Sequence, residues 1–345
     1  MPAASDPERC GGATGWRPAI SVVMPVYNGA EVLSASLAPL AAMRRGGEIA
    51  EIIVVDDGST DASVEVARAF GARVLASGGR LGPGGARNVA AQSAVGDILW
   101  FVDADVVVHD DAAQALGRAF EASGAAAVFG SYDDRPAGTN FLSQYKNLVH
   151  YYYHHRGGGE ADTFWAGCGA VRKDVFLASG GFDAEAYPHP SIEDIELGYR
   201  LRDHGHRIVL APEVQGTHLK IWRLGNLLHT DTARRALPWS RLIQSRRRLP
   251  DALNVGMGER IRAVLAAALL AAAALAISGL LPAWVPALVL LSAIAANAGL
   301  FAFFRRARGT LFALGAVAFH QLYYLYSSAV YVWCWLERRL AICHR

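Results

Sequence analysis

Two aspartates separated by one residue are the first chemical signal in this sequence. Asp103 and Asp105 directly follow the apolar run 98–102, and residues two apart on an extended segment face the same side. Both carboxylates can therefore meet one cation, and Mg²⁺ or Mn²⁺ prefers such oxygen ligands and bridges to phosphate oxygens. A helix cap or a turn explains most isolated pairs of this kind, but the strand-like run before this one favours a metal site.

A second acidic pair, Asp56 and Asp57, follows the apolar run 52–55 and precedes Gly58. One of the two can bind the base or ribose of a nucleotide while the glycine permits a tight turn. A plain strand-to-helix turn with a polar cap is the alternative. Tyr27 can stack on a base, with core packing as its alternative.

The segment 82–88 is rich in glycine and contains Arg87. Such a loop at the start of a helix lets backbone N–H groups approach phosphate, and the arginine can add a charge-assisted contact. The spacing fits neither the G-x-G-x-x-G fingerprint nor a Walker A loop. Dinucleotide binding and ATP hydrolysis are therefore disfavoured.

Further candidates lie downstream, and each has a structural alternative. Glu193 and Asp194 can supply the carboxylate base that a sugar hydroxyl acceptor needs, or they can be two acids that favour a helix dipole. His218 can be a third metal ligand, although a lone histidine often has a structural role. Lys220 can bind a diphosphate.

Apolar runs alternate with helical patterns in the first half of the chain and must position these groups. The alternation predicts a mostly parallel sheet with helices on both faces, and such sheets bind ligands beyond the carboxyl ends of their strands. Asn28, Asp56 and Asp103 follow three expected strands, so we expect them at one edge. A helix is also expected from Ser191 to Asp203, with Ser191 as its N-cap. The expected strands are 20–24, 52–55, 73–75 and 98–102, and the expected helices are 31–43, 63–70 and 86–94.

The apolar content is concentrated in the last quarter. Hydrophobic residues make up 52% of the chain and the mean hydropathy is +0.20, yet 263–304 and 309–336 carry no charged side chain. A bilayer core needs roughly 20 apolar residues per helix. We therefore expect a membrane region at 261–337, with about three spans at 261–281, 284–304 and 311–336. A buried core hairpin is the alternative.

Charge is also unevenly distributed. The net charge of +2 gives no sign of nucleic-acid binding, but the segment 223–260 is basic, which suits an amphipathic stretch on the anionic cytoplasmic leaflet. A solvated basic face is the alternative. Residues 1–17 read as a loose tail without a signal-peptide pattern. A multi-pass protein of the inner (plasma) membrane with a cytoplasmic catalytic domain is the expected location.

In their order and intervals, these motifs resemble the family 2 glycosyltransferases, and the resemblance runs from Ser21 to about Trp222. It implies an inverting enzyme with the GT-A fold over residues 18–222, an α/β domain followed by the C-terminal transmembrane helices. The motifs are Ser-Val-Val-Met-Pro-Val-Tyr-Asn28, Val-Val-Asp-Asp-Gly-Ser59, Gly-Gly-Ala-Arg-Asn88, Phe-Val-Asp-Ala-Asp105, Gly-Cys-Gly-Ala170, Gly-Gly-Phe-Asp183 and Glu-Asp194.

The resemblance also implies roles for single residues. Pro25, Tyr27 and Asp57 would hold the base and ribose, and Arg87 would lie near the diphosphate. Asp103 would contact the nucleotide and Asp105 the metal, Mg²⁺ or Mn²⁺. Asp194 would deprotonate the acceptor, with Glu193 as its neighbour. The full expected donor set is Pro25, Tyr27, Asn28, Asp56, Asp57, Arg87, Asp103 and Lys220, and the full expected metal set is Asp103, Asp105 and His218.

The expected activity is transfer of a single sugar from a nucleotide sugar, with UDP expected from the family's habits, to a lipid or lipid-linked acceptor. Processive members of the family carry Gln-x-x-Arg-Trp after the Glu-Asp pair. The nearest match here, Gln244-Ser-Arg-Arg247, lacks the tryptophan and lies far downstream. A processive polysaccharide synthase therefore stays an alternative, as do transfer to a soluble or protein acceptor and a catalytically silent membrane scaffold.

Overall fold

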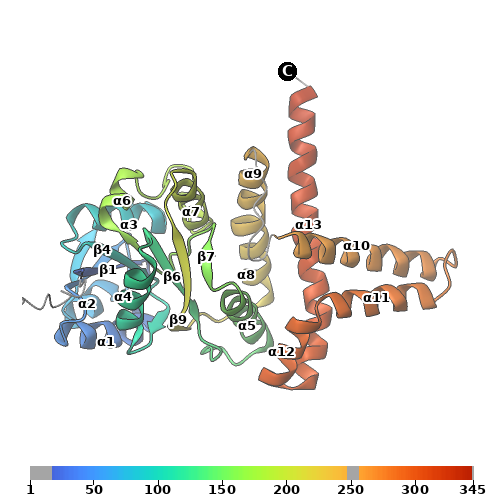
Figure 1. The fold of residues 1–345 in the computed structure, drawn as a ribbon, viewed down its shortest axis with the longest axis horizontal. Coiled ribbons are helices and arrows are strands. Elements are labelled where there is room, and N and C mark those ends of the chain that lie inside the picture. The colour runs from blue at the N-terminus through green and yellow to red at the C-terminus, as the bar shows by residue number, and fades with distance from the viewer. Residues whose placement is uncertain (1–17, 247–255, 344–345) are drawn as a thin grey trace, which may run out of the picture.

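The computed structural model describes residues 18–246 and 256–343. The expected tail 1–17 and part of the expected interface segment, including Arg247, lie outside the described residues. Figure 1 shows two parts, which we name the α/β body (residues 18–222) and the helical part (residues 223–343).

A nine-stranded sheet forms the centre of the α/β body, in the order β3-β2-β1-β4-β8-β6-β9-β5 with β7 paired to β9. β1 pairs in parallel with β2 and β4, and β2 pairs in parallel with β3. β8 pairs antiparallel with both β4 and β6, so the sheet is parallel in its first half and mixed overall. The strands are β1 Ile20–Val26, β2 Glu51–Asp56, β3 Arg73–Ala76, β4 Ile98–Val102, β5 Val106–Val108, β6 Ala127–Tyr132, β7 Gly159–Ala161, β8 Cys168–Arg172 and β9 Ile208–His218.

Helices cover both faces of this sheet, because alternate residues of each strand point to opposite sides. Val22 and Met24 of β1 belong to a core with α1 and α4, whereas Val23 belongs to a second core with α3, α6 and α7. The predicted α/β fold with helices on both faces is confirmed. The helices of the body are α1 Ala30–Arg45, α2 Ser63–Ala69, α3 Gly82–Ser93, α4 Ala112–Ser123, α5 Phe141–Arg156, α6 Lys173–Ala178 and α7 Glu193–Asp203.

The start of α7 differs from the prediction. Its N-cap is Ile192, without a side-chain cap, so the assignment of Ser191 as N-cap is wrong. The Ser191 hydroxyl donates instead to the backbone oxygen of Arg234 at 2.8 Å, and its backbone N–H donates to Glu193 Oε2 at 2.9 Å. Because the Ser191 hydroxyl bonds to the helical part, it does not cap α7.

The helical part consists of a column beside a long helix, and of a hairpin that projects away from it (Figure 1). The column is α8 Leu224–His229, the π-helix η1 Thr230–Ala236 and α9 Leu237–Ser245; the long helix is α13 Thr310–Cys343. The hairpin is α10 Met257–Ile277 and α11 Trp284–Ala296, followed by α12 Ala298–Arg308. The helical part docks on α5, where Tyr145 and Leu148 pack with Leu300 and Phe304.

Among the described residues, α10 is long and apolar enough to cross a membrane, and α11 with α12 passes the same test only as a pair bent by 73°. α13, which contains the expected span 311–336, is not among these candidates, since its tyrosines, His320 and Gln321 lower its hydropathy. The described chain thus holds one candidate span, or two, where three were expected.

Candidate active site

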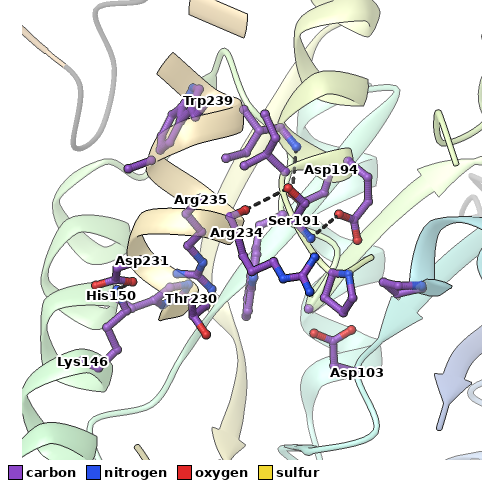
Figure 2. Close-up of a pocket in the computed structure, with 18 of the residues that line it drawn as sticks. Asp103, Lys146, His150, Ser191, Asp194, Thr230, Asp231, Arg234, Arg235 and Trp239 are labelled. Atoms are coloured by element: carbon purple, nitrogen blue, oxygen red, sulfur yellow. Dashed lines mark hydrogen bonds and ion pairs between the residues drawn. The ribbon is translucent and has the colours of Figure 1, made fainter. Parts of the chain in front are cut away.

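A cavity of about 1310 Å³ lies between the α/β body and the helical part. Figure 2 shows Asp103 and Asp194 on one side of it, Lys146 and Asp231 on the other, and Arg234 and Arg235 between them. All the predicted site residues line it except Asp56: Pro25, Tyr27, Asn28, Asp57, Arg87, Asp103, Asp105, Glu193, Asp194, His218 and Lys220.

Asp103 is bound to a buried arginine. Arg87 Nη2 lies 2.5 Å from Asp103 Oδ1, and Arg87 Nη1 lies 3.3 Å from Glu193 Oε1. Only 4% of the Arg87 side chain is exposed. Burial raises the pKa of the Asp103 carboxyl, while the charge of Arg87 acts in the opposite direction. The guanidinium expected near the diphosphate is thus already engaged by two carboxylates.

Asp105 has a different partner. Its Oδ2 lies 3.5 Å from His218 Nε2, because β5 and β9 pair antiparallel with Val106 opposite His218. The His218 ring stacks on Tyr132 at a centroid distance of 4.3 Å. Burial alone would raise the pKa of Asp105, but the hydrogen bond and charge of His218, with the charge of Lys220, hold it below the usual value.

The donor set fits a divalent metal that is completed by substrate. Within the described ranges, no group of three or more His, Cys, Asp or Glu side chains converges on one point. Asp105 and His218 both line the cavity, and Mg²⁺ is commonly held by one or two protein carboxylates together with substrate phosphates and water. Of the expected metal set, the structure therefore brings Asp105 and His218 together and turns Asp103 toward Arg87.

Asp57 organises the glycine-rich loop. Its two carboxylate oxygens accept the backbone N–H groups of Leu81 and Gly82, at 2.8 and 2.9 Å. Gly82 has a φ of +73°, and a Cβ there would lie 2.5 Å from the Pro188 oxygen, so a side chain does not fit. Because Asp57 takes these two N–H groups, the loop presents them to a carboxylate of the protein rather than to a phosphate.

Asn28 and Asp56 hold neighbouring turns. The side-chain oxygen of Asn28 accepts the Thr60 N–H at 2.8 Å, and Asp56 Oδ1 accepts the Ser59 N–H at 3.0 Å. Tyr27 is 45% exposed, and the guanidinium of Arg80 lies 4.0 Å from the centre of its ring. An exposed aromatic face at the cavity, backed by a cation, suits stacking with a base.

Asp194 is placed by backbone donors at the cavity wall. Its Oδ2 accepts the Ala166 N–H at 3.0 Å, and its Oδ1 accepts the Ile195 N–H at 2.8 Å. Burial raises the pKa of Asp194, and these N–H groups partly offset that effect. Burial and the charge of Asp194 raise the pKa of Glu193 to about 7. Two acids with different partners can serve different roles, and Asp194 is free of an ion pair among the described residues.

Several cavity residues were missed by the sequence reasoning. Lys146, His150, Arg234 and Arg235 all line the cavity. From the sequence, the two arginines belong to a basic stretch that is expected on the membrane surface. In the folded structure this stretch packs against the α/β body, and both arginines line the cavity. Lys220, which was predicted, lies with its Nζ 4.4 Å from the Trp222 ring centre.

The sheet, with polar side chains after β1 and carboxylates after β2 and β4, and a cavity that can hold a nucleotide define the class of GT-A glycosyltransferases. Residues 21–178 match the family model for glycosyl transferase family 2, so this part of the chain is a glycosyltransferase family 2 domain.

Relatives and solved structures agree with this assignment. The chain is 30% identical over 241 residues to the validoxylamine A glucosyltransferase of Streptomyces hygroscopicus subsp. jinggangensis, covering 59% of this chain and 56% of that protein. It is 26% identical over 209 residues to the glycosyltransferase AglE of Haloferax volcanii, covering 58% and 67%. The chain spans about half the length of the first curated relatives that it matches.

The mannosyltransferase PcManGT from Pyrobaculum calidifontis, solved with GDP-Man and Mn²⁺, has a similar fold. The TM-score is 0.52 at 18% identity, over 92% of this chain and 88% of that one. At this identity the similarity is one of fold. Because the match covers 92% of this chain, it includes helices of the helical part as well as the α/β body.

Proposed function

We propose that this protein transfers a single sugar, with inversion and with help from a divalent metal, from a nucleotide sugar to a lipid or lipid-linked acceptor at the cytoplasmic membrane surface. UDP is the proposed nucleotide. The observation that carries the proposal is the continuity of the cavity, which is lined by Asp103, Asp105 and Asp194 at one end and by α10 and α13 at the other. The neighbour solved with GDP-Man and Mn²⁺ supports a nucleotide-sugar donor.

The proposed chemistry gives each of these groups one role. Asp194 accepts the proton of the acceptor hydroxyl while the acceptor oxygen forms a bond to the anomeric carbon of the sugar. The bond between that carbon and the diphosphate breaks on the opposite face. Lys220 is a cation at the cavity that can meet the departing diphosphate. A metal held by Asp105 and His218 would add charge stabilisation of that leaving group.

The hairpin of α10 and α11 is the proposed membrane contact. Its tip is apolar and exposed, with Ile277 at 89%, Leu280 at 72% and Trp284 at 65%. α11 has 13 residues and is about 20 Å long, less than the roughly 30 Å of a bilayer core. We therefore propose that the hairpin enters the cytoplasmic leaflet without a far-side loop, in place of the three full spans that were expected.

Transfer of one sugar is favoured over processive synthesis. Gln244, the start of the nearest processive motif, donates to the Tyr331 backbone oxygen at 3.2 Å and does not line the cavity. The intact carboxylates, above all Asp105 and Asp194, disfavour a silent scaffold.

The test is turnover by the full chain in lipid nanodiscs with a panel of nucleotide sugars. We expect one donor to release its nucleoside diphosphate, and mass spectrometry to find one added sugar on a component of a membrane lipid extract. Chelator should stop the reaction and Mn²⁺ should restore it. Products with many sugars would instead favour a processive synthase, and no release from any donor, with or without lipid, would contradict the proposal.

A further inference from the structure

The π-helix η1 places two adjacent arginines, Arg234 and Arg235, at the cavity. π-helical turns are rare and frequently occur at functional sites. Neither guanidinium has a hydrogen-bond or ion-pair partner in the part of the chain that the structure describes; Arg234 is held only through its backbone oxygen, which accepts from Ser191. A guanidinium is well suited to bind phosphate oxygens in pairs.

The acidic residue of the same helix forms its ion pair with another cation. Asp231 is the acid of η1, but its Oδ1 lies 2.5 Å from Lys146 Nζ and its Oδ2 accepts from Tyr326 at 2.8 Å. Its carboxylate is therefore paired with Lys146, while the charge of Arg235 acts on it without an ion pair. Both ring nitrogens of His150, another residue of the cavity lining, are buried without a hydrogen-bond partner among the described residues.

The cavity then changes character toward the helical part. On the side of α9, α10 and α13, apolar side chains line it together with polar ones. The apolar residues are Ala263, Val264, Ala267, Ile243 and Val332, and the polar residues include Glu259, Ser327 and Ser328. Carboxylates, cations without an ion-pair partner among the described residues, and apolar side chains thus line the same cavity. This combination suits an amphiphile with a hydrocarbon tail and an anionic group between the tail and the reacting atom.

On this basis, and resting on the proposed function, we propose that the acceptor is a lipid that carries a phosphate group, and that Arg234 and Arg235 bind this phosphate while the tail lies between α10 and α13. Arg235 and Asp194 line the same cavity, and Figure 2 shows Arg235 between Lys146 and Asp194. A phosphate bound at Arg235 would thus lie in the same cavity as the base.

Two kinds of lipid share this chemistry. The phosphate oxygen can itself attack the sugar, as in a lipid monophosphate, or a hydroxyl of a group attached through the phosphate can attack. Asp194→Asn separates them, because an ionised phosphate needs no base whereas a hydroxyl does. A large loss of transfer would indicate the hydroxyl, and a loss of less than about tenfold would indicate the phosphate.

The closing experiment measures binding, so that it does not depend on turnover. A fluorescent short-chain prenyl phosphate and the matching prenyl alcohol are titrated into the full chain in nanodiscs without donor. We expect the phosphate to bind at least tenfold more tightly than the alcohol, Arg235→Gln to remove most of that difference, and Arg235→Lys to restore part of it. Arg241→Gln is the matched control, since Arg241 lies one helix further on, pairs with Glu337 on the surface and does not line the cavity.

Equal binding of the phosphate and the alcohol by the wild-type protein would overturn the inference. An Arg235→Gln variant that folds normally, keeps the preference for the phosphate and weakens nucleotide binding instead would also overturn it, and would assign the arginines to the donor diphosphate. Tight phosphate binding without sugar transfer would uphold the inference while contradicting the proposed function.

Discussion

The α/β body and the helical part build the two ends of one cavity in different ways. In the body, Arg87 and the carboxylates at the site are already held by protein partners. Arg87 is bound by Asp103 and Glu193, and Asp105 lies beside His218. Asp194 accepts two backbone N–H groups. In the helical part, Asp231 compensates Lys146, while Arg234 and Arg235 have no acidic partner among the described residues. The first end is assembled before any ligand arrives, and the second keeps positive charge for one.

This contrast separates two kinds of charged residue. Removing a group from the first end should disturb folding or chemistry, because its partner is left behind. Removing an arginine from the second end should change ligand affinity and leave stability unchanged.

The largest effect is expected for Asp194→Asn. The substitution removes a general base, whose contribution is typically about 10²- to 10⁴-fold in rate, so kcat for a hydroxyl acceptor should fall by that order with the donor KM unchanged. Burial raises the pKa of Asp194 above the ordinary value for Asp. Wild-type activity should therefore rise as the pH increases through this raised pKa, and the variant should not show this rise. Initial rates across pH test this, with the exposed Asp110→Asn as the control. A variant with wild-type rates would remove Asp194 from the chemistry.

Arg87→Leu should be the most damaging change to stability. It leaves the buried Glu193 and the partly exposed Asp103 without their cation, and breaking a buried pair such as Arg87–Glu193 costs about 3–5 kcal/mol. Denaturant unfolding of the purified protein measures the loss, and Arg118→Leu on the exposed face of α4 is the control. Adding Glu193→Gln to Arg87→Leu should recover part of the stability. Unchanged stability with a raised donor KM would instead place Arg87 at the diphosphate, as the family resemblance implied.

The sequence predicted the first end of the cavity well because its signals are local. The apolar run 98–102 before Asp103 and Asp105 fixes a strand and the loop after it, and the structure agrees. His218 was proposed from its residue type alone. Its place beside Asp105 depends on the antiparallel pairing of β5 with β9, which a reading of single segments does not contain.

The second end could not be predicted, because contacts between distant segments create it. Arg234 was assigned to the membrane surface, and its true place depends on the hydrogen bond from Ser191, 43 residues away. Likewise Lys146 and Asp231 are 85 residues apart. No local pattern marks such pairs, and the same contact explains why the predicted N-cap at Ser191 was wrong.

Asp105→Ala tests the metal assignment at the first end. A metal ion supplies several kcal/mol of charge stabilisation to a leaving group, so transfer should fall by about a hundredfold or more and the remaining activity should no longer respond to Mn²⁺. The protein should still float with liposomes, because the hairpin is untouched. Asp110→Ala is the control. Full activity with normal metal dependence would contradict the role of Asp105.

Tyr326→Phe should have the smallest effect and probes the hydrogen bond within the helical part that holds Asp231. The hydroxyl donates to Asp231 Oδ2 at 2.8 Å, and a hydrogen bond to a charged group contributes about 1.5–3 kcal/mol. We expect a loss near the lower end of that range in thermal unfolding, because Lys146 still pairs with Asp231. Tyr331→Phe is the matched control, since its ring lines the same cavity and its hydroxyl has no hydrogen bond within the described chain. If the carboxylate of Asp231 turns toward the arginines once Tyr326 no longer holds it, phosphate binding should weaken several-fold as well. Lower stability with unchanged phosphate binding would mean that Lys146 alone keeps Asp231 away from Arg234 and Arg235.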